Sequence, residues 1–139
     1  MEIVKEFKFH MAHRLPLHKG KCRMLHGHTY KLVVHLEGEV EGYINTEGSG
    51  MVMDFGDVRH EIERIVLDRL DHATALWQND ELVIPLRQAG MKVAIFQLQP
   101  TAEAMIEEIW AWIVFGASLP RLKKLELWET DTSAAIKEG

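Results

Sequence analysis

The only cysteine of the chain and two of its histidines lie in the segment Cys22-Arg-Met-Leu-His26-Gly27-His28. Because His26 and His28 are two residues apart, their rings would lie on the same face of an extended strand. A third histidine, His13, ends an earlier alternating run. Three histidines are a recurring ligand set of catalytic zinc sites, which keep one position open for water or substrate. The spacing predicts a Zn2+ site, although local hydrogen bonds could satisfy each histidine instead.

Cys22 has several possible roles. A single cysteine cannot form an intrachain disulfide, and a free cysteine is commonly a small buried hydrophobe. Its neighbours Lys19, Lys21 and Arg23, together with the predicted metal, are cationic and favour the thiolate. A thiolate beside a metal is either a fourth ligand, which would make the site structural, or an acid–base group or nucleophile. The spacing does not separate these alternatives.

Asp71 and His72 follow one another at the end of a predicted helix. A carboxylate there can orient or support an imidazole in proton transfer. Adjacent side chains seldom hydrogen-bond well to each other, so the pair could act on a shared third group. The alternative is that His72 interacts with the last carbonyl groups of the helix.

Three more polar residues stand at the ends of predicted elements. Thr101 is predicted to cap a helix, and Glu103 in the first turn of that helix is explained by the helix dipole. Glu129 ends an apolar strand, where its carboxylate could accept two parallel hydrogen bonds from an amidine-like or guanidine-like group. The alternative is that Glu129 is simply a solvent-exposed carboxylate at the end of a strand, which would give the same sequence pattern.

Composition restricts the class of protein. A length of 139 residues suits one domain, residues 1–139. The composition, with 47% hydrophobic and 27% charged residues, is typical of a globular chain. A net charge of −5 argues against nonspecific nucleic-acid binding. The N-terminus lacks the features of a signal peptide, and Glu107 and Glu108 interrupt the longest apolar run, Met105–Leu119. We therefore expect a soluble, cytoplasmic protein that does not act on membranes.

The hydrophobic periodicity predicts an α+β protein with a mostly antiparallel sheet. Weaker signals suggest a short strand at 51–53, a short helix near 80–88 that Pro85 would disturb, and a polar C-terminal tail. Two helices can cover only one face of the sheet, so the other face is either solvated or meets another subunit. The strands are predicted at Ile3–Leu15, His26–Glu37, Met91–Leu98 and Leu122–Thr130, and the helices at Phe55–Leu70 and Ala102–Phe115.

Several motifs, spread over nearly the whole chain, together resemble the 6-pyruvoyltetrahydropterin synthase family, and most closely its 6-carboxytetrahydropterin synthase branch. The matching motifs are Phe7-x-Phe9-x-x-Ala12-His13-Arg14-Leu15, Cys22-x-x-x-His26-Gly27-His28, Met53-Asp54-Phe55, Leu70-Asp71-His72, Pro100-Thr101-x-Glu103 and Glu129-Thr130.

The resemblance assigns roles to three groups of residues. It implies that zinc is bound by His13, His26 and His28. It implies that the acid–base groups are the thiol of Cys22 with Asp71 and His72. It implies that Glu129 anchors the pterin ring and that Thr101 and Glu103 bind substrate.

The resemblance also implies the tunnelling fold, a four-stranded antiparallel sheet with two helices packed on one face. Subunits of this family join sheet to sheet into a trimeric barrel. Two trimers usually stack into a homohexamer, with active sites at the subunit interfaces. Such an assembly would cover the sheet face that the helices leave open.

The implied reaction is the conversion of 7,8-dihydroneopterin 3'-triphosphate to 6-carboxy-5,6,7,8-tetrahydropterin, with loss of triphosphate and acetaldehyde, in queuosine and related 7-deazapurine biosynthesis. The three residues between Cys22 and His26 resemble the 6-carboxy branch, since the biopterin-forming branch typically has a longer gap. The alternatives are formation of 6-pyruvoyltetrahydropterin at the same site and a noncatalytic, zinc-stabilised pterin-binding protein.

Overall fold

Two long antiparallel strands form the centre of the sheet. The computed structural model describes all residues from Met1 to Gly139. Strand β1 (Glu2–His13) pairs with β2 (His26–Glu37) along its whole length, from Glu2 opposite Glu37 to His13 opposite His26. Alternate residues of β1 are buried from Phe7 to His13, as expected when one face of a sheet packs on a core. Strand β2 buries Tyr30, Leu32, Val34 and Leu36 on the same face, and Val33 as well. The two strands therefore present matched rows of side chains to the helices.

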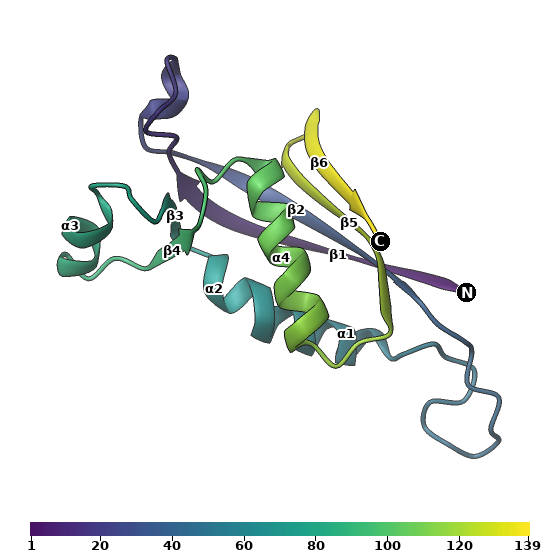
Figure 1. Cartoon of the computed structure of the whole chain (residues 1–139). Helices are drawn as coiled ribbons and strands as arrows, with labels where there is room; N and C mark the ends of the chain where they lie inside the picture. The colour runs from purple at the N-terminus through teal and green to yellow at the C-terminus, as the bar shows by residue number, and fades with distance from the viewer.

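Four shorter strands extend the sheet on both sides, in the order β4-β3-β1-β2-β5-β6 (Figure 1). Antiparallel pairing joins β5 to β2 and β6 to β5, whereas β3 is parallel to both β1 and β4. The added strands are β3 (Thr74–Trp77), β4 (Val93–Phe96), β5 (Arg121–Thr130) and β6 (Ser133–Glu138).

The prediction of a four-stranded antiparallel sheet is therefore wrong, because the sheet is mixed and has six strands. Strand β3 has only four residues, too few to show a period of two. Strand β6 lies at the sheet edge and buries only Ala135, so its sequence looks like a polar tail. The strand predicted at residues 51–53 does not form.

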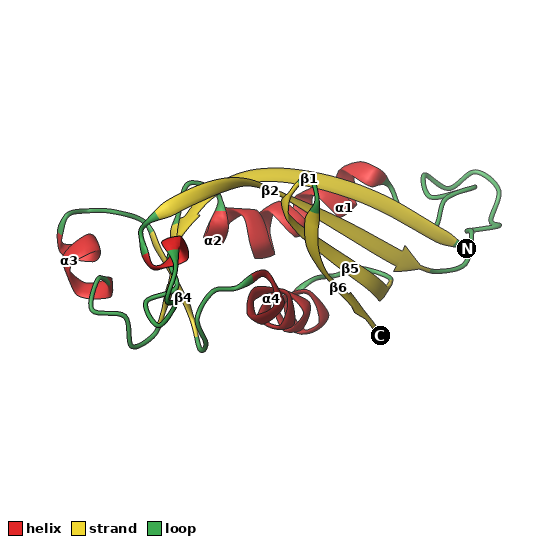
Figure 2. Cartoon of the chain, turned by 90° about the horizontal axis from the view of Figure 1, so that it is seen from above, coloured by secondary structure: helices red, strands yellow, loops and turns green.

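The two predicted helices lie on one face of the sheet, as expected (Figure 2). The predicted helix over Phe55–Leu70 is present as α1 (Phe55–Ile62), a π-helical turn η2 (Glu63–Leu67) and α2 (Asp68–Leu70). Helix α4 (Ala102–Gly116) is capped by the Thr101 hydroxyl, which accepts the N–H of Ala104 at 3.1 Å. No helix is both long and apolar enough to span a membrane.

The short helix expected near residues 80–88 forms as α3 (Val83–Gln88), in the connection between β3 and β4. Pro85 lies in the first turn, where a backbone N–H has no partner within the helix, so the proline costs no hydrogen bond there. A further short helix, η1 (Lys21–Arg23), lies in the loop between β1 and β2.

The hydrophobic core lies between the sheet and the helices. Side chains from β1 and β2 pack there against the apolar faces of α1 and α4, and burial of this apolar area is the main stabilising contribution. The largest fully buried side chains include Phe9, Tyr30, Leu32, Ile62 and Ile109.

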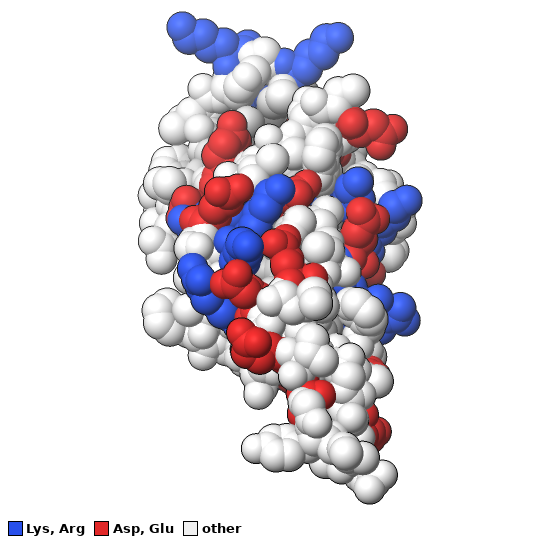
Figure 3. Space-filling model, turned by 90° about the vertical axis from the view of Figure 1, so that its right-hand side faces the viewer, with Lys and Arg blue, Asp and Glu red and all other residues white.

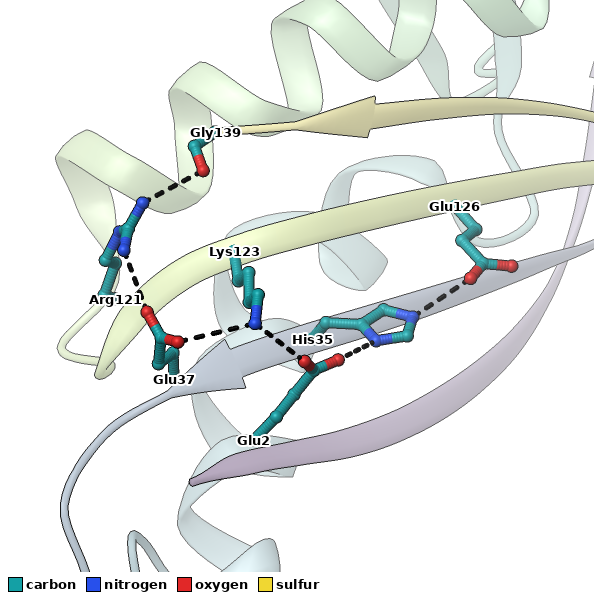
Figure 4. Close-up of polar contacts among 7 residues, drawn as sticks. All are labelled: Glu2, His35, Glu37, Arg121, Lys123, Glu126 and Gly139. Carbon is teal, nitrogen blue, oxygen red and sulfur yellow. Dashed lines mark hydrogen bonds and ion pairs between the residues drawn. The ribbon is translucent and has the colours of Figure 1, made fainter.

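The sheet face away from the helices carries a network of ion pairs (Figure 4). His35 lies between the buried residues Val34 and Leu36 of β2, so its ring lies on the opposite face. Its Nδ1 is 2.7 Å from Glu2 Oε1 and its Nε2 is 3.0 Å from Glu126 Oε1. Lys124 is the main reason that the pKa of Glu126 falls to about 2. This part of the open face is polar and internally paired.

The same mixture of charges continues around the end of the molecule where both termini lie. Acidic and basic side chains are interspersed there, without a large patch of one sign (Figure 3).

A buried ion pair ties the chain after β1 to the segment that leads into α3. Arg14 Nε lies 2.8 Å from Asp80 Oδ2, and Nη2 lies 2.5 Å from Oδ1. Burial raises the pKa of Asp80, but the hydrogen bonds from Arg14 and from the N–H of Leu82 outweigh this effect and leave the pKa below its ordinary value. The ionised pair should therefore stabilise the fold at neutral pH.

We expect Asp80→Ala to lower the free energy of unfolding at neutral pH by about 2 to 3 kcal/mol, because Arg14 would lose a charged partner. Urea denaturation measures the change. Since the folded-state pKa is depressed, the difference should vanish as the pH falls below 3.8 and on through the folded-state pKa. Glu81→Gln is the control: Glu81 is 88% exposed and 3.8 Å from Arg14, so an equal loss there would contradict the prediction.

Candidate metal centre and active site

His13, His26 and His28 lie together where β1 and β2 meet the loop between them. The strand register places His13 opposite His26 and Met11 opposite His28, so all three rings lie on the core face. Their ring centroids are separated by 4.6, 5.2 and 5.1 Å. One nitrogen from each ring can be chosen so that these atoms lie within 4.8 Å of one another. The three histidines can therefore hold a metal ion.

Backbone carbonyl groups orient two of the three rings. His13 Nδ1 lies 2.9 Å from the Pro100 oxygen, and His26 Nδ1 lies 2.7 Å from the Met24 oxygen. A carbonyl can only accept, so each Nδ1 carries the hydrogen and each Nε2 presents its lone pair. Support of this kind is typical of metal-binding histidines.

The third ring supplies an unsatisfied nitrogen. His28 Nε2 is buried and has no hydrogen-bond partner, which is uncommon because buried polar atoms are usually paired. A metal ion held by the three Nε2 atoms would satisfy this atom. The donor set therefore fits a divalent ion that prefers imidazole nitrogen.

The surroundings favour the neutral form of His13. Burial lowers the pKa of His13, despite opposing contributions from the Pro100 carbonyl and from Glu129, so the neutral form that a metal requires is favoured. Tyr30 lies behind the cluster, with its hydroxyl 3.4 Å from both ring nitrogens of His13. Burial raises the pKa of Tyr30, so this hydroxyl stays protonated.

Glu129 faces the same cluster from β5. Its Oε1 lies 3.6 Å from His28 Nε2, and its side chain is 28% exposed. The carboxylate is therefore accessible from solvent while it borders the histidines. A ligand bound by Glu129 would lie close to a metal at this site.

Cys22 lies in η1, and its side chain is only partly buried. Its carbonyl oxygen accepts the N–H of Leu15 at 2.8 Å, which closes the loop between the strands. The cluster of closely spaced potential ligands contains the three histidines but not Cys22. Cys22 is therefore not among the side chains that the fold gathers into the possible metal site.

Asp71 and His72 lie on the other side of β1 from the three histidines. His72 packs edge-on against His10, with ring centroids 5.9 Å apart, and His10 lies on the face of β1 opposite to His13. The side chains of Asp71 and His72 meet each other, with Oδ1 and Nδ1 3.0 Å apart. This contact between neighbours was not expected. It accompanies a left-handed backbone at His72, where φ is 60°.

An open groove of about 490 Å³ lies beside His72. Its lining includes His10, Gly27, His28, Thr29, His72 and Thr74. The hydrogen bond from the N–H of His10 is the main reason that the pKa of Asp71 is lowered. Asp71 is therefore ionised beside His72 and can support a protonated imidazole.

Thr101 and Glu103 lie at the start of α4. Thr101 uses its hydroxyl to cap the helix, and Glu103 is exposed without a polar partner. The preceding residue, Pro100, supplies the carbonyl that holds His13, so the start of α4 approaches the histidine cluster. Neither side chain forms a hydrogen bond or ion pair with that cluster.

Sequence reasoning missed three contributors to these arrangements. Tyr30 had a usable signal, because it lies two residues after His28 and so shares its strand face. His10 was visible as another histidine in the first alternating run. The Pro100 carbonyl had no signal, because a backbone contact across 87 residues depends on the tertiary fold.

The fold and the histidine cluster define a class of protein, an α+β chain in which three histidines at the end of the central strand pair could hold a metal ion. Residues 2–139 match the family model described as 6-pyruvoyl tetrahydropterin synthase. The chain belongs to the 6-pyruvoyl tetrahydropterin synthase family.

Individual relatives cover nearly the whole chain. The chain is 36% identical over 136 residues to a 6-carboxy-5,6,7,8-tetrahydropterin synthase of Haemophilus influenzae, with 95% of this chain and 94% of the relative covered. It is 38% identical over 135 residues to the Synechocystis protein of the same name, with coverages of 96% and 89%.

Among solved structures, the 6-pyruvoyl tetrahydropterin synthase of Caenorhabditis elegans matches with a TM-score of 0.73 and 26% identity. The match covers 100% of this chain and 95% of that one. The family likeness therefore includes the arrangement of the elements as well as the sequence motifs.

Proposed function

We propose that this chain is a zinc-dependent lyase that converts 7,8-dihydroneopterin 3'-triphosphate to 6-carboxy-5,6,7,8-tetrahydropterin, with loss of triphosphate and acetaldehyde. The observation that carries the proposal is the convergence of His13, His26 and His28 around the unsatisfied Nε2 of His28. The curated relatives named for this product support the 6-carboxy reaction. The pathway would be that of queuosine and related 7-deazapurines.

In this proposal the residues around the histidines bind and orient the substrate. Glu129 accepts hydrogen bonds from the amidine-like N–H groups of the pterin ring, a geometry that one carboxylate can satisfy with two parallel bonds. Thr101 and Glu103 lie beside the substrate at the start of α4. Zinc bound to the histidines would supply a Lewis acid for an oxygen of the substrate side chain.

The chain's own acid–base groups move the protons. Cys22 transfers a proton at the substrate side chain, and His72, supported by Asp71, performs the other acid–base step. The 3.0 Å contact between Asp71 and His72 supports this pairing, since a carboxylate stabilises the imidazolium form. Both groups must reach the same substrate for the scheme to work.

Within one chain, His72 and the histidine cluster lie on opposite faces of β1, so we propose that neighbouring subunits complete each active site. A homohexamer built as a dimer of trimers would bring His72 of one copy to the metal site of another. The open sheet face and the exposed position of His72, whose side chain is 75% accessible, support such an arrangement.

Product analysis tests the function. We expect the zinc-loaded protein to convert dihydroneopterin triphosphate to a carboxy product together with acetaldehyde, detected by mass spectrometry. A pyruvoyl product would instead favour the second candidate, which is supported by the likeness to the C. elegans enzyme. Unchanged substrate despite binding would indicate a noncatalytic pterin-binding protein. Protein stripped of metal by a chelator and then reloaded is the control for zinc dependence.

A further inference from the structure

We propose that His10, held by Thr29, is a positioning residue that fixes the ring of His72 for proton transfer. The inference rests on the proposed function, because it takes His72 to be an acid–base group. It concerns residues on the sheet face opposite to the histidine cluster. Neither His10 nor Thr29 belongs to the motifs that carry the family resemblance.

The backbone of β1 anchors the segment that carries His72. The N–H of His72 donates to the His10 carbonyl at 2.7 Å, and the N–H of Ala12 donates to the Ala73 carbonyl at 3.0 Å. The N–H of His10 donates to Asp71 Oδ1 at 3.0 Å. The position of the Asp71–His72 pair is therefore set by its attachment to β1 around His10.

This backbone anchoring leaves the His72 ring itself weakly held. The side chain is 75% exposed, and the backbone at His72 has a left-handed φ of 60°. A residue other than glycine in that region carries strain, which is often found at functional positions. The ring contacts the Asp71 carboxylate on one side, so a second contact is needed to limit its rotation.

His10 supplies that second contact. Its ring lies edge-on to the His72 ring, with an interplanar angle of 76° and a centroid distance of 5.9 Å. Edge-to-face pairs at such distances are favourable. Together, the Asp71 carboxylate and the His10 ring restrict His72 from two directions.

The ring of His10 is in turn fixed by the neighbouring strand. Thr29 lies directly opposite His10 in the β1–β2 register, and its hydroxyl hydrogen-bonds to His10 Nδ1 at 3.0 Å. His10, Thr29 and His72 border the same groove. A continuous series of contacts therefore runs from the rigid strand pair, through Thr29 and His10, to His72.

Steady-state kinetics on the zinc-loaded oligomer test the proposal. We expect His10→Ala to lower kcat about 10-fold or more, since small misplacements of a catalytic group can cost up to about 100-fold. The KM for dihydroneopterin triphosphate should change by less than about 2-fold, because His10 does not bind the pterin ring. His10→Phe keeps an aromatic edge against His72 and should recover part of the loss.

The Thr29 variants test whether the hydroxyl group itself holds His10. Thr29→Val has nearly the same shape as threonine but lacks the hydroxyl, so its kcat should fall, as in His10→Ala. Thr29→Ser keeps a hydroxyl, so its kcat should stay near the wild-type value. Glu6→Gln, on the same face of β1 and without a polar partner, is the control and should keep wild-type kinetics. Unfolding curves and zinc content should match wild type in every variant.

Crystal structures of the wild type and of His10→Ala give a readout that does not depend on activity. The His72 ring should be ordered against Asp71 in the wild type and rotated or disordered in the variant. An unchanged His72 ring, or a variant with wild-type kcat, would overturn the proposal. If the wild type itself proves inactive, the proposed function fails, and the His72 ring in the two structures still decides whether His10 positions it.

Discussion

Replacing His26 by alanine is expected to remove the metal and the activity together. His26 presents Nε2 to the cluster because its Nδ1 is held by the Met24 carbonyl. Loss of a group that only supports a metal ligand by a hydrogen bond typically costs about 10- to 100-fold in metal affinity or activity. Loss of a ligand itself should therefore cost more than about 100-fold in affinity. Because a bound metal contributes several kcal/mol to stabilising charge in the transition state, turnover should fall by more than about 1000-fold.

Metal analysis of the purified variant, together with product formation, measures both effects. His60→Ala is the matched control, because His60 is an exposed histidine on α1 away from the cluster. The control should keep its metal and its activity. A His26→Ala protein that is free of metal yet fully active would refute the assignment of this site.

Replacing Cys22 by alanine is expected to leave the metal in place and to abolish most of the turnover. The histidine cluster forms without Cys22, so metal affinity should stay within a few-fold of wild type. A positioned acid–base group typically contributes about 100- to 10,000-fold to the rate, and a loss in that range is expected for kcat. Zinc content and single-turnover kinetics on the same preparation measure the two quantities.

The outcome distinguishes the roles that the sequence leaves open for the thiol. If zinc is lost with Cys22, the thiol is a fourth ligand and the site is structural. Unchanged kcat would show that the thiol takes no part in proton transfer. Leu17→Ala is a suitable control, because Leu17 is a 67% exposed side chain in the same loop.

The pattern of the sequence is enough to predict the central elements. Alternation identifies the two long strands, because one face of each must be buried. Asp54 and Thr101 identify the starts of the two main helices, because their side chains can satisfy free N–H groups at those positions. Both residues make these capping contacts, to Gly56 and Ala104.

The same pattern does not predict the edges of the sheet. Strand β6 consists mostly of small and polar residues and buries only one side chain, that of Ala135, so it shows no alternation of apolar residues. Strand β3 pairs parallel to strands distant in sequence, and such pairing leaves no local signal. Both strands become visible only when their partners supply the hydrogen bonds.

The sequence by itself determined that His26 and His28 share a strand face, because a spacing of two residues does so in any extended strand. It also placed His13 on the buried face of its own strand. Only the tertiary structure decided that His13 stands opposite His26, since the register depends on how the intervening loop closes. The tertiary structure also placed Asp71 and His72 on the other face of β1, against His10. That position follows from long-range backbone pairing, which the local sequence does not encode.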